Sequence, residues 1–488
     1  MMSLARTFVS ACRLATAVRP AVLVLIAASL VAGCGVVARS VKDGYDNIAN
    51  SDLFWHGRHG ELDESEQLWI ELAWTYVGNN THPGTGLVGA LDGYSSFTMT
   101  NLAEYLVALH AANEFELLKE KEFDERLSAL LKFLNTMPLY DNALPNRVYH
   151  IETGNMVDFG AQPGAVGWSA IEIGRLLIWL NYYRRHYPRF AEYIDKAVLR
   201  WDFCRLIDDS GSLTGGRVVD GQLERYQEGR LGYEEYAAYG YYLWGFEPSQ
   251  ADQFEPYQSR RFYQVTLLAD GRDPRVDGVY DPLLPTPYWY AGMEFNWDRW
   301  DDLESSDTSY SRLDMARQAR NLYLIQERRW QRDKLYTARA EHVLSEAPFF
   351  VYDSVFGLGT PFATLDGDGN FHDDVALVST KATFMMWSLF ETEYTDKLMW
   401  ITRHLYDPEK GWYEGRKELT GGYEQSVTLS TNAAVLQSLL YKRQGKLFKN
   451  PPPSSRLERL RGDEFYHPGR CQPATTPANL FIPSQNQP

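Results

Sequence analysis

Residues 226–240, with the sequence YQEGRLGYEEYAAYG, bring carboxylates, tyrosines and glycines together at the start of an expected helix. Gly229 and Gly232 permit backbone angles that other residues resist, so a loop can turn sharply into that helix. Gly232 suits the N-cap, and Glu235 falls where its side chain can reach back to free backbone N–H groups. Glu234 has no such structural task, and carboxylates flanked by aromatic rings favour acid/base chemistry on a sugar. An ordinary capped helix, whose acidic first turn complements the helix dipole, explains the same residues.

Hydrolysis of a glycosidic bond needs a protonated carboxyl beside the leaving oxygen and a second, ionised carboxylate as base or nucleophile. We expect Glu234 to be the proton donor, with Glu228 next, because a tyrosine-lined junction could raise a carboxyl pKa by desolvation. Adjacent residues on a helix point about 100° apart, so Glu234 and Glu235 cannot form the pair together. The second carboxylate must come from a distant loop. The candidates are Asp92, Asp158, Glu414 and Glu424, although a residue of this kind in a loop is more often a turn former or a solvated side chain.

Aromatic side chains make up 14% of the chain, which suits either a bulky helical core or a groove where flat rings stack on sugars. Trp412 and Tyr413 lie in a short segment bounded by glycines, a position that favours stacking on a sugar ring. Arg230 could bind an acidic sugar or pair with Glu228. The other aromatic residues predicted to bind substrate are Tyr233 and Trp289.

The acidic loop at residues 366–370, DGDGN, offers oxygen ligands of the kind that Ca²⁺ prefers. The EF-hand pattern requires glycine at the sixth position and glutamate at the twelfth, where this chain has Phe371 and Leu377. That motif is therefore excluded, and a simpler Ca²⁺ site with Asp373 or Asp374 is the alternative. Histidine-based zinc signatures, phosphate loops and G-x-S-x-G elbows are absent. We expect no cofactor and no metal.

The first 33 residues have the pattern of an export signal. An arginine-containing start precedes a short apolar run at residues 21–30, which is too short to favour a permanent membrane span. Val31-Ala32-Gly33-Cys34 resembles a bacterial lipobox, which implies cleavage before Cys34 and lipidation of its thiol. Gly35 is not the aspartate associated with inner-membrane retention. We therefore expect a cell-envelope lipoprotein on the outer membrane, facing the periplasm or the exterior.

The charge of the chain excludes one class of partner. The formal net charge is −16, and removal of residues 1–33 takes away three arginines and no acids, which gives −19. Such a surface repels phosphate backbones, so nucleic acid is not an expected partner. Cys204 and Cys471 remain after Cys34 is lipidated, and either a disulfide or two thiols is compatible with an oxidising compartment. The oligomeric state is left open.

Periodicity predicts a mainly helical chain. Leu127, Leu130, Leu131 and Leu134 follow the i, i+3, i+4, i+7 rule of an amphipathic helix, and residues 173–180 repeat the pattern. Residues 247–307 differ, because they are rich in proline, aspartate and aromatic side chains. We expect an extended excursion there with a small β element, forming a lid or groove wall, or alternatively a structural brace.

The rhythm of helix, loop and helix indicates an all-α fold, an α/α toroid of antiparallel helical hairpins with long loops. The expected organisation is a signal peptide at 1–33, a tether at 34–62, a toroid domain at 63–446 and a proline-rich tail at 447–488. In such a ring the inner helices are apolar nearly all round, and the connections at one end gather over the axis to form a concave site.

Several short stretches resemble one family of bacterial extracytoplasmic proteins of unknown function, whose architecture is related to that of glucoamylase-like α/α toroids. These stretches are Thr85-Gly86-Leu87-Val88, Leu144-Pro145-Asn146 with Tyr149, residues 227–234, Ser379-Thr380-Lys381 with Trp387, Gly411-Trp412-Tyr413-Glu414-Gly415 and Thr431-Asn432-Ala433. The resemblance implies the toroid, and by analogy glycoside hydrolysis. The family pattern has Trp-Asp where this chain has Thr100-Asn101.

Three functions fit these observations. The leading one is a lipid-anchored glycoside hydrolase that acts on a bacterial extracellular or periplasmic polysaccharide through paired carboxylates. The second is a non-catalytic lipoprotein that binds glycan during polysaccharide export or assembly. The third is a polysaccharide lyase, which would need Tyr or His as base and an arginine to neutralise a uronate.

Overall fold

The structure is a computed structural model that describes residues 56–229, 231–254, 256–272, 282–302 and 310–449. The predicted signal peptide, Cys34, Arg230, Cys471 and most of the proline-rich tail lie outside the described residues. The chain divides into two units, residues 1–56 and residues 57–488, and the helices and strands of the described residues belong to the second unit. None of its described helices is long and apolar enough to cross a membrane.

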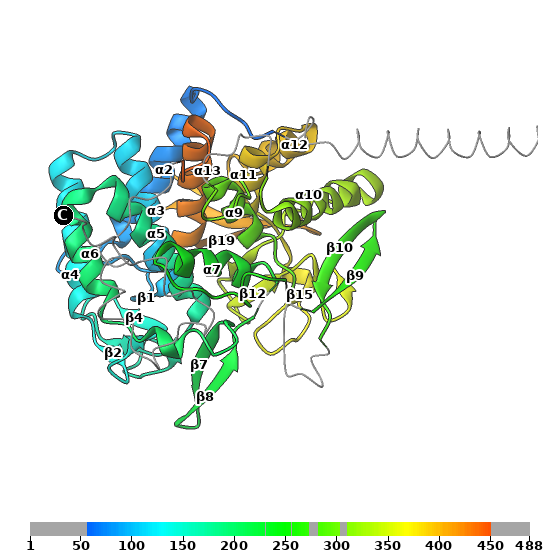
Figure 1. The fold of residues 1–488 in the computed structure, drawn as a ribbon. Helices are drawn as coiled ribbons and strands as arrows, with labels where there is room; N and C mark the ends of the chain where they lie inside the picture. Colours follow the sequence, from blue (N-terminus) through cyan, green and yellow to red (C-terminus); the bar gives the residue numbers. More distant parts are fainter. Residues whose placement is uncertain (1–55, 230, 255, 273–281, 303–309, 450–488) are drawn as a thin grey trace, which may run out of the picture. The chain divides into compact units, whose positions relative to one another are not determined.

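The described residues are mainly helical, as the periodicity predicts (Figure 1). The α-helices among them are α2 (Glu64–Asn80), α3 (Met99–Glu114), α4 (Glu120–Thr136), α5 (Ala170–His186), α6 (Ala191–Val198), α7 (Tyr233–Leu243), α9 (Thr286–Phe295), α10 (Leu313–Asp333), α11 (Thr380–Leu389), α12 (Glu393–Thr402) and α13 (Leu429–Gln444). Single 3-10 turns lie at Pro188–Phe190, Phe203–Arg205 and Asp373–Val375.

Six helices contact one another in a closed cycle. In the order α3, α5, α7, α9, α11 and α13, each packs against the next, and α13 packs against α3, beside it in Figure 1. Helix α3 buries every residue from 102 to 112, so no side of this stretch is exposed to solvent. Helix α4, by contrast, buries a single stripe that includes Leu127, Leu130, Leu131 and Leu134, which confirms the predicted amphipathic helix. Apolar cycle helices and amphipathic flanking helices thus form two layers of the core.

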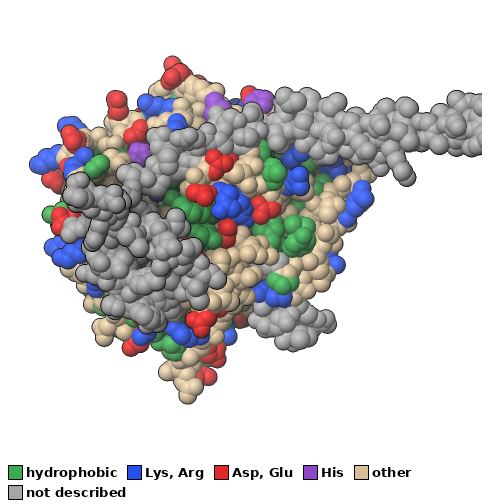
Figure 2. All heavy atoms as spheres, viewed as in Figure 1, with side chains coloured by type: hydrophobic (Ala, Val, Ile, Leu, Met, Phe, Trp, Pro, Cys, Tyr) green, Lys and Arg blue, Asp and Glu red, His purple; other side chains and the backbone are tan. Residues whose placement is uncertain are grey.

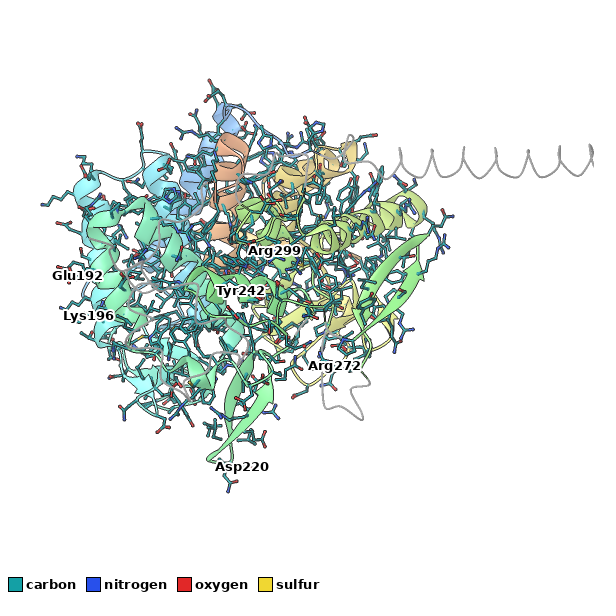
Figure 3. All side chains as sticks on the ribbon, viewed as in Figure 1. Glu192, Lys196, Asp220, Tyr242, Arg272 and Arg299 are labelled. Atoms are coloured by element: carbon teal, nitrogen blue, oxygen red, sulfur yellow. The ribbon has the colours of Figure 1, made fainter. Side chains whose placement is uncertain are left out.

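The prediction of an all-α fold is wrong in one respect, because short strands occupy many of the connections. They are β1 (Ser96–Thr98), β2 (Leu139–Tyr140), β3 (Leu144–Pro145), β4 (Val148–His150), β5 (Met156–Val157), β6 (Gly167–Trp168), β7 (Thr214–Val219), β8 (Gln222–Gln227), β9 (Tyr257–Phe262), β10 (Val265–Asp270), β11 (Glu341–Val343), β12 (Phe350–Asp353), β13 (Phe356–Gly357), β14 (Thr360–Pro361), β15 (Thr364–Leu365), β16 (Leu377–Ser379), β17 (Tyr406–Asp407), β18 (Gly411–Lys417) and β19 (Tyr423–Val427). The pairs among these described strands are antiparallel, an isolated parallel bridge joins Ala338 to Val378 of β16, and the largest described sheet joins β16, β17 and β19 to β18. Strands β7 and β8 form a hairpin whose tip is marked by Asp220 in Figure 3.

Residues 247–307 contain both an expected and an unexpected element. The predicted small β element is present as the β9–β10 hairpin, which packs on α10 through a pair of hydrogen bonds between Gln318 and the backbone of Leu268. The proline content predicts an extended segment at residues 286–295, and this prediction is wrong. These residues form α9, which is buried throughout. Pro287 lies in the first turn, where no intrahelical partner for its missing N–H is needed, so it begins the helix without breaking it.

The domain begins before the expected boundary at residue 63. The backbone N–H of Arg58 donates to Ser388 O at 2.8 Å, and that of Gly60 donates to Lys442 O at 3.0 Å. Residues assigned to the tether from sequence therefore already lie against α11 and α13.

Two glycines allow α5 and α7 to pack unusually closely. A Cβ placed on Gly174 would lie 2.7 Å from the Cβ of Ala237, and one placed on Gly240 would overlap the carbonyl of Gly174. Close-packed cores tolerate added methyl groups poorly, because the surrounding backbone must shift. The contact between these helices thus requires glycine at both positions.

We expect Gly240→Ala to lower the free energy of unfolding by about 1–3 kcal/mol, because α5 and α7 must separate. Gly78→Ala is the matched control, since Gly78 lies in α2 with no neighbouring atom within 4 Å of an added Cβ. That substitution should stabilise the protein by about 0.5–1 kcal/mol, because alanine loses less conformational entropy in a helix. Urea unfolding of both variants measures the difference, and equal effects would contradict the close packing.

Candidate active site

The helices of the cycle carry polar side chains near their N-terminal ends, and these side chains meet. Glu104, Arg175, Tyr290 and Lys381 lie on α3, α5, α9 and α11, and each is at most 4% exposed. Glu341 on β11 joins them. We call these five residues the central cluster. Helix N-termini favour negative charge, so several of them around one point would attract carboxylates or an anionic transition state.

Lys381 organises one side of the central cluster. Its Nζ lies 2.9 Å from Glu341 Oε1 and 3.2 Å from the Oγ of Ser430 in the first turn of α13. The hydroxyl of Thr286 donates to Glu341 Oε2 at 2.9 Å. Burial acts to raise the pKa of Glu341, but the Lys381 ammonium and these hydrogen bonds outweigh it and lower that pKa. Glu341 is therefore an ionised carboxylate, with its side chain 16% exposed.

The pKa of Glu104 is shifted in the opposite direction from that of Glu341. Its side chain accepts a hydrogen bond from Asn101 Nδ2 at 2.9 Å. Burial raises the pKa of Glu104, although Arg175, Lys381 and hydrogen bonds from Asn101 and Ser430 favour the ionised form. Glu104 thus retains its proton to higher pH than a solvated glutamate does, while Glu341, beside the same ammonium, loses its proton at lower pH.

A third carboxyl, Glu172, lies in the first turn of α5 and contacts the start of α3. Its Oε2 accepts from the backbone N–H of Thr100 at 3.4 Å. Burial raises the pKa of Glu172, the Arg147 guanidinium opposes this shift, and the neighbouring carboxylate of Glu228 adds to it. Unlike Glu104, Glu172 is partly exposed. It is therefore a partly exposed carboxyl that keeps its proton to higher pH than a solvated glutamate does.

Beneath the central cluster, Glu294 joins four helices of the cycle. Its Oε1 accepts from Trp179 Nε1 at 3.0 Å and Gln437 Nε2 at 2.8 Å, and its Oε2 accepts from the Tyr236 hydroxyl at 2.6 Å. Arg175 Nη1 lies 3.7 Å from the same carboxylate and also donates to the Tyr236 hydroxyl at 2.7 Å. Arg175 Cζ in turn lies 3.5 Å from the centre of the Tyr290 ring. This network fixes Arg175 and Tyr290 in place.

The structure gives the carboxylates predicted near α7 other partners. Glu234, 1% exposed, accepts from the backbone N–H of Leu213 at 2.8 Å and from Gln227 Nε2 at 3.0 Å, so it fastens the β7–β8 hairpin to α7. Glu235 Oε2 accepts from Gly232 N at 2.6 Å, the capping contact that the sequence predicts. Both contacts favour the structural interpretation of this helix start.

Glu228 acts at the start of a different helix. Its Oε2 accepts from the backbone N–H groups of Ala170 and Ile171, at 2.5 and 3.3 Å, and so caps α5. Its other oxygen lies 3.8 Å from Arg147, the ion-pair partner that the structure shows. Glu228 contributes to the site indirectly, through its effect on the pKa of Glu172.

The predicted second carboxylates are distributed over several loops. Asp92 pairs with Lys410 at 2.9 Å on the surface, and Asp158 accepts backbone N–H groups of its own turn. Glu424 accepts from Ser345 N and the Ser426 hydroxyl, at 3.0 and 2.9 Å. Glu414, 1% exposed, accepts from the hydroxyls of Thr428 and Thr431 at the start of α13. Glu414 alone of these four raises the pKa of Lys381, so it borders the central cluster.

The predicted sugar-stacking residues divide by exposure. Trp412 and Trp289 are fully buried, with Trp412 packed edge-on against Trp69 and Phe384. Their ring faces belong to the core and are not accessible to a sugar. Tyr233 and Tyr413 are partly exposed and remain candidates.

The predicted acidic loop is closed by its own hydrogen bonds. Asp366 accepts from the backbone of Asp368 and Asn370 and from His372 Nε2. In the part of the chain that the structure describes, no group of three or more His, Cys, Asp or Glu side chains is arranged to hold a metal ion.

The sequence analysis names none of the residues of the central cluster as site residues, nor Glu172. These residues are Glu104, Arg175, Tyr290, Glu341, Lys381 and Glu172. Glu104 and Lys381 carry a signal that could have found them, because each is a lone charged residue inside an otherwise apolar helix. Charged side chains are almost never fully buried without a partner or a function. Glu341 lies on a short strand that follows an unremarkable loop, and its sequence neighbourhood gives no such signal.

If Glu234 is structural, Glu234→Gln should lower the free energy of unfolding by about 1–2 kcal/mol, because an amide cannot accept on both sides. Activity per folded molecule should not change. Glu125→Gln, a 65% exposed glutamate on α4, is the control and should stay within about 0.5 kcal/mol of wild type. Loss of turnover in folded Glu234→Gln would restore the catalytic interpretation.

Solved structures with a similar fold include two described as candidate glucoamylases and one glucanase. The candidate glucoamylase from Bacteroides fragilis NCTC 9343 has a TM-score of 0.57 at 14% identity, covering 84% of this chain and 96% of its own. The one from Bacteroides caccae ATCC 43185 has a TM-score of 0.56 at 14% identity, covering 79% and 93%. The endo-β-1,2-glucanase from Chitinophaga pinensis, in complex with sophorotriose and glucose, has a TM-score of 0.54 at 14% identity, covering 80% and 95%. At such identity the likeness concerns the fold alone.

No curated protein matches the chain. One family model does, over residues 69–445, and it carries the description "Protein of unknown function (DUF3131)". The matched segment includes every residue of the central cluster. Since it spans more than half of the sequence, the chain belongs to this DUF3131 family.

Proposed function

We propose that the protein is a lipid-anchored glycoside hydrolase that acts on a bacterial extracellular or periplasmic polysaccharide. One observation carries this proposal: linked carboxyls at one end of the helix cycle have pKa values shifted in opposite directions, up for Glu172 and Glu104 and down for Glu341. Paired-carboxylate hydrolysis needs one protonated and one ionised carboxyl at the same pH. It requires no cofactor.

The helix cycle is, in this proposal, an α/α toroid. The closed sequence of contacts from α3 to α13 supports it, as does the likeness to glucoamylase-type structures. The likeness to a glucanase held with sophorotriose supports an oligosaccharide or polysaccharide as the partner of this chain too. The lipobox ending at Cys34 supports a lipid anchor in the cell envelope.

Glu172 is the proton donor in this mechanism. A general acid must reach the leaving oxygen, and Glu172 is partly exposed whereas Glu104 is only 2% exposed. Glu341 is the second carboxylate, kept ionised by Lys381. Glu104 connects the two, since it lies one turn beyond Asn101 on α3 and interacts with Lys381. The chain of contacts from Glu172 to Glu341 is therefore continuous.

A non-catalytic glycan-binding lipoprotein is the second candidate. It is favoured by Asn101, because the resembled family has an aspartate at this position and an asparagine cannot exchange a proton. A lyase is disfavoured by Tyr290, the tyrosine that stacks on Arg175. Burial raises the pKa of Tyr290 to about 12, which makes it a poor base near neutral pH.

Glu172→Gln and Glu341→Gln should each lower kcat for reducing-end release by about 100-fold or more, because an amide neither gives a proton nor carries charge. The substrates to test are a panel of bacterial glycans that includes β-1,2-glucan. Glu424→Gln, a buried glutamate at another site, should leave kcat within a few-fold. Wild type that binds a glycan without releasing product would instead establish the binding protein.

The pH profile of kcat should be bell-shaped around the shifted pKa values. Activity should fall on the acid side as pH drops through the lowered pKa of Glu341, which must be ionised. It should fall on the alkaline side as pH rises through the raised pKa of Glu172, which must be protonated.

Lys381→Met should move the acid limb of that profile to higher pH by about 1 unit or more, because the ammonium no longer stabilises the Glu341 carboxylate. Lys410→Met removes a surface ion pair with Asp92 and is the control. An acid limb that stays in place in Lys381→Met would exclude Glu341 as the titrating carboxylate.

A further inference from the structure

One corner of this acidic protein is basic. Arg260 and Arg261 lie on β9 just before the turn of the β9–β10 hairpin, and Arg328, Arg332 and Lys334 lie at the C-terminal end of α10, which contacts that turn through Arg328. We call these five residues the basic corner. Basic side chains are visible along the edge formed by α10 and this hairpin in Figure 2. The formal charge of the whole chain is −16.

The basic corner is held together by specific contacts. Arg328 Nη1 donates to the carbonyls of Tyr263 and Gln264 in the hairpin turn, at 3.3 and 3.0 Å. Arg332 Cζ lies 5.0 Å from the centre of the Tyr263 ring, whose hydroxyl bonds to Asp333. Tyr263 and Gln264 both have positive φ angles, 48° and 61°, which side-chain-bearing residues rarely adopt. The turn is thus fixed against α10 in a strained conformation.

The local charge balance remains positive after nearby acids are counted. Glu327 and Asp333 lie on the same part of α10, which gives a sum of +3, and Glu393, Asp396 and Lys397 of the adjacent α12 change this sum to +2. Arg332 is 72% exposed, and Arg260, Arg261 and Lys334 are exposed as well. These cations are therefore accessible to an external anionic partner.

An aromatic residue lies beside these cations. The Trp330 ring has Lys334 Nζ 5.4 Å from its centre and Lys397 Nζ of α12 at 5.5 Å. Lys397 is neutralised by Glu393, but it brings α12 next to the basic corner. Tryptophan and basic residues together are typical of surfaces that meet lipid headgroups.

The start of the domain contacts α12. Arg58 Nη2 pairs with Asp396 at 2.7 Å, and Asp396 is the neighbour of Lys397 on α12. Residue 58 follows the predicted lipidation site, Cys34, by 24 residues. The described chain therefore enters the domain at α12, the helix whose Lys397 lies over the Trp330 ring.

We propose that the basic corner docks the domain on an anionic lipid surface through headgroup phosphates. The surface lies outside the central cluster, so the inference goes beyond the proposed hydrolysis, and it uses the predicted anchor only to explain the choice of face. Docking there would fix how the tethered domain is oriented on its membrane.

The test uses the chain with Cys34→Ser, so that no lipid contributes, and vesicles of phosphatidylcholine with or without phosphatidylglycerol. Binding should require phosphatidylglycerol and weaken with added salt. The triple variant Arg260→Gln, Arg261→Gln, Arg332→Gln should lower the partition coefficient about 100-fold, since each basic residue near an anionic surface contributes about fivefold.

The matched control is Lys119→Gln, Lys121→Gln, Lys196→Gln, which changes net charge equally. These lysines are exposed on α4 or its start and on α6, and Figure 3 shows Lys196 on the side of the view away from α10. It should bind vesicles as the parent does.

Equal loss in both triple variants, or no binding by the parent chain, would overturn the proposal. Binding to a soluble acidic glycan in place of vesicles would overturn the lipid assignment. Glycan turnover by both variants should match the parent, so that failure here is separable from failure of the proposed hydrolase.

Discussion

A carboxylate that cannot reach water must find its donors inside the protein, and Glu294 imposes this requirement on the whole domain. Its partners come from α5, α7 and α13, while Glu294 itself lies on α9. Removing one partner of such a buried group costs more than the bond itself contributes, because the remaining group is left unsatisfied. The hydrogen bonds to Glu294 therefore fix how these four helices are arranged. That arrangement also fixes the positions of the residues one or two turns nearer the N-terminal end of each helix.

The same scarcity of water explains how two glutamates of the site come to have pKa values shifted in opposite directions. Burial alone raises the pKa of every carboxyl. The pKa of Glu341 departs from this rule because the Lys381 ammonium lies 2.9 Å away. For Glu172, burial outweighs the effect of the Arg147 guanidinium, and the Glu228 carboxylate adds to the upward shift. The Lys381 ammonium thus lowers the pKa of Glu341 and leaves the raised pKa of Glu172 without a comparable partner. The contrast between them depends on geometry set by α11 and β11, which is why it has no trace in local sequence.

Sequence patterns predicted the elements whose information is local. The leucine stripe of α4, the cap at Glu235 and the strand pair at 257–270 follow from periodicity, capping and turn composition. The number of prolines in this region does not predict the helix at 286–295, because a proline in the first turn of a helix does not break it. The structural partners of Glu234 could not be predicted for a related reason: its bonds to Leu213 and Gln227 involve a hairpin whose packing the sequence does not reveal. Arg230 and Cys34, which lie outside the described residues, stay predictions.

The contact between Gly174 and Gly240 has a mechanical consequence. Two helices whose backbones touch cannot slide or tilt against each other without breaking that contact, so α5 and α7 form one stiff unit. Glu172 and Arg175 are carried on that unit. Glu341, by contrast, is carried on a three-residue strand at the edge of a small sheet. In the proposed hydrolase, ligands of different sizes would therefore be accommodated by movement on the β11 side, while the α5 side would stay fixed.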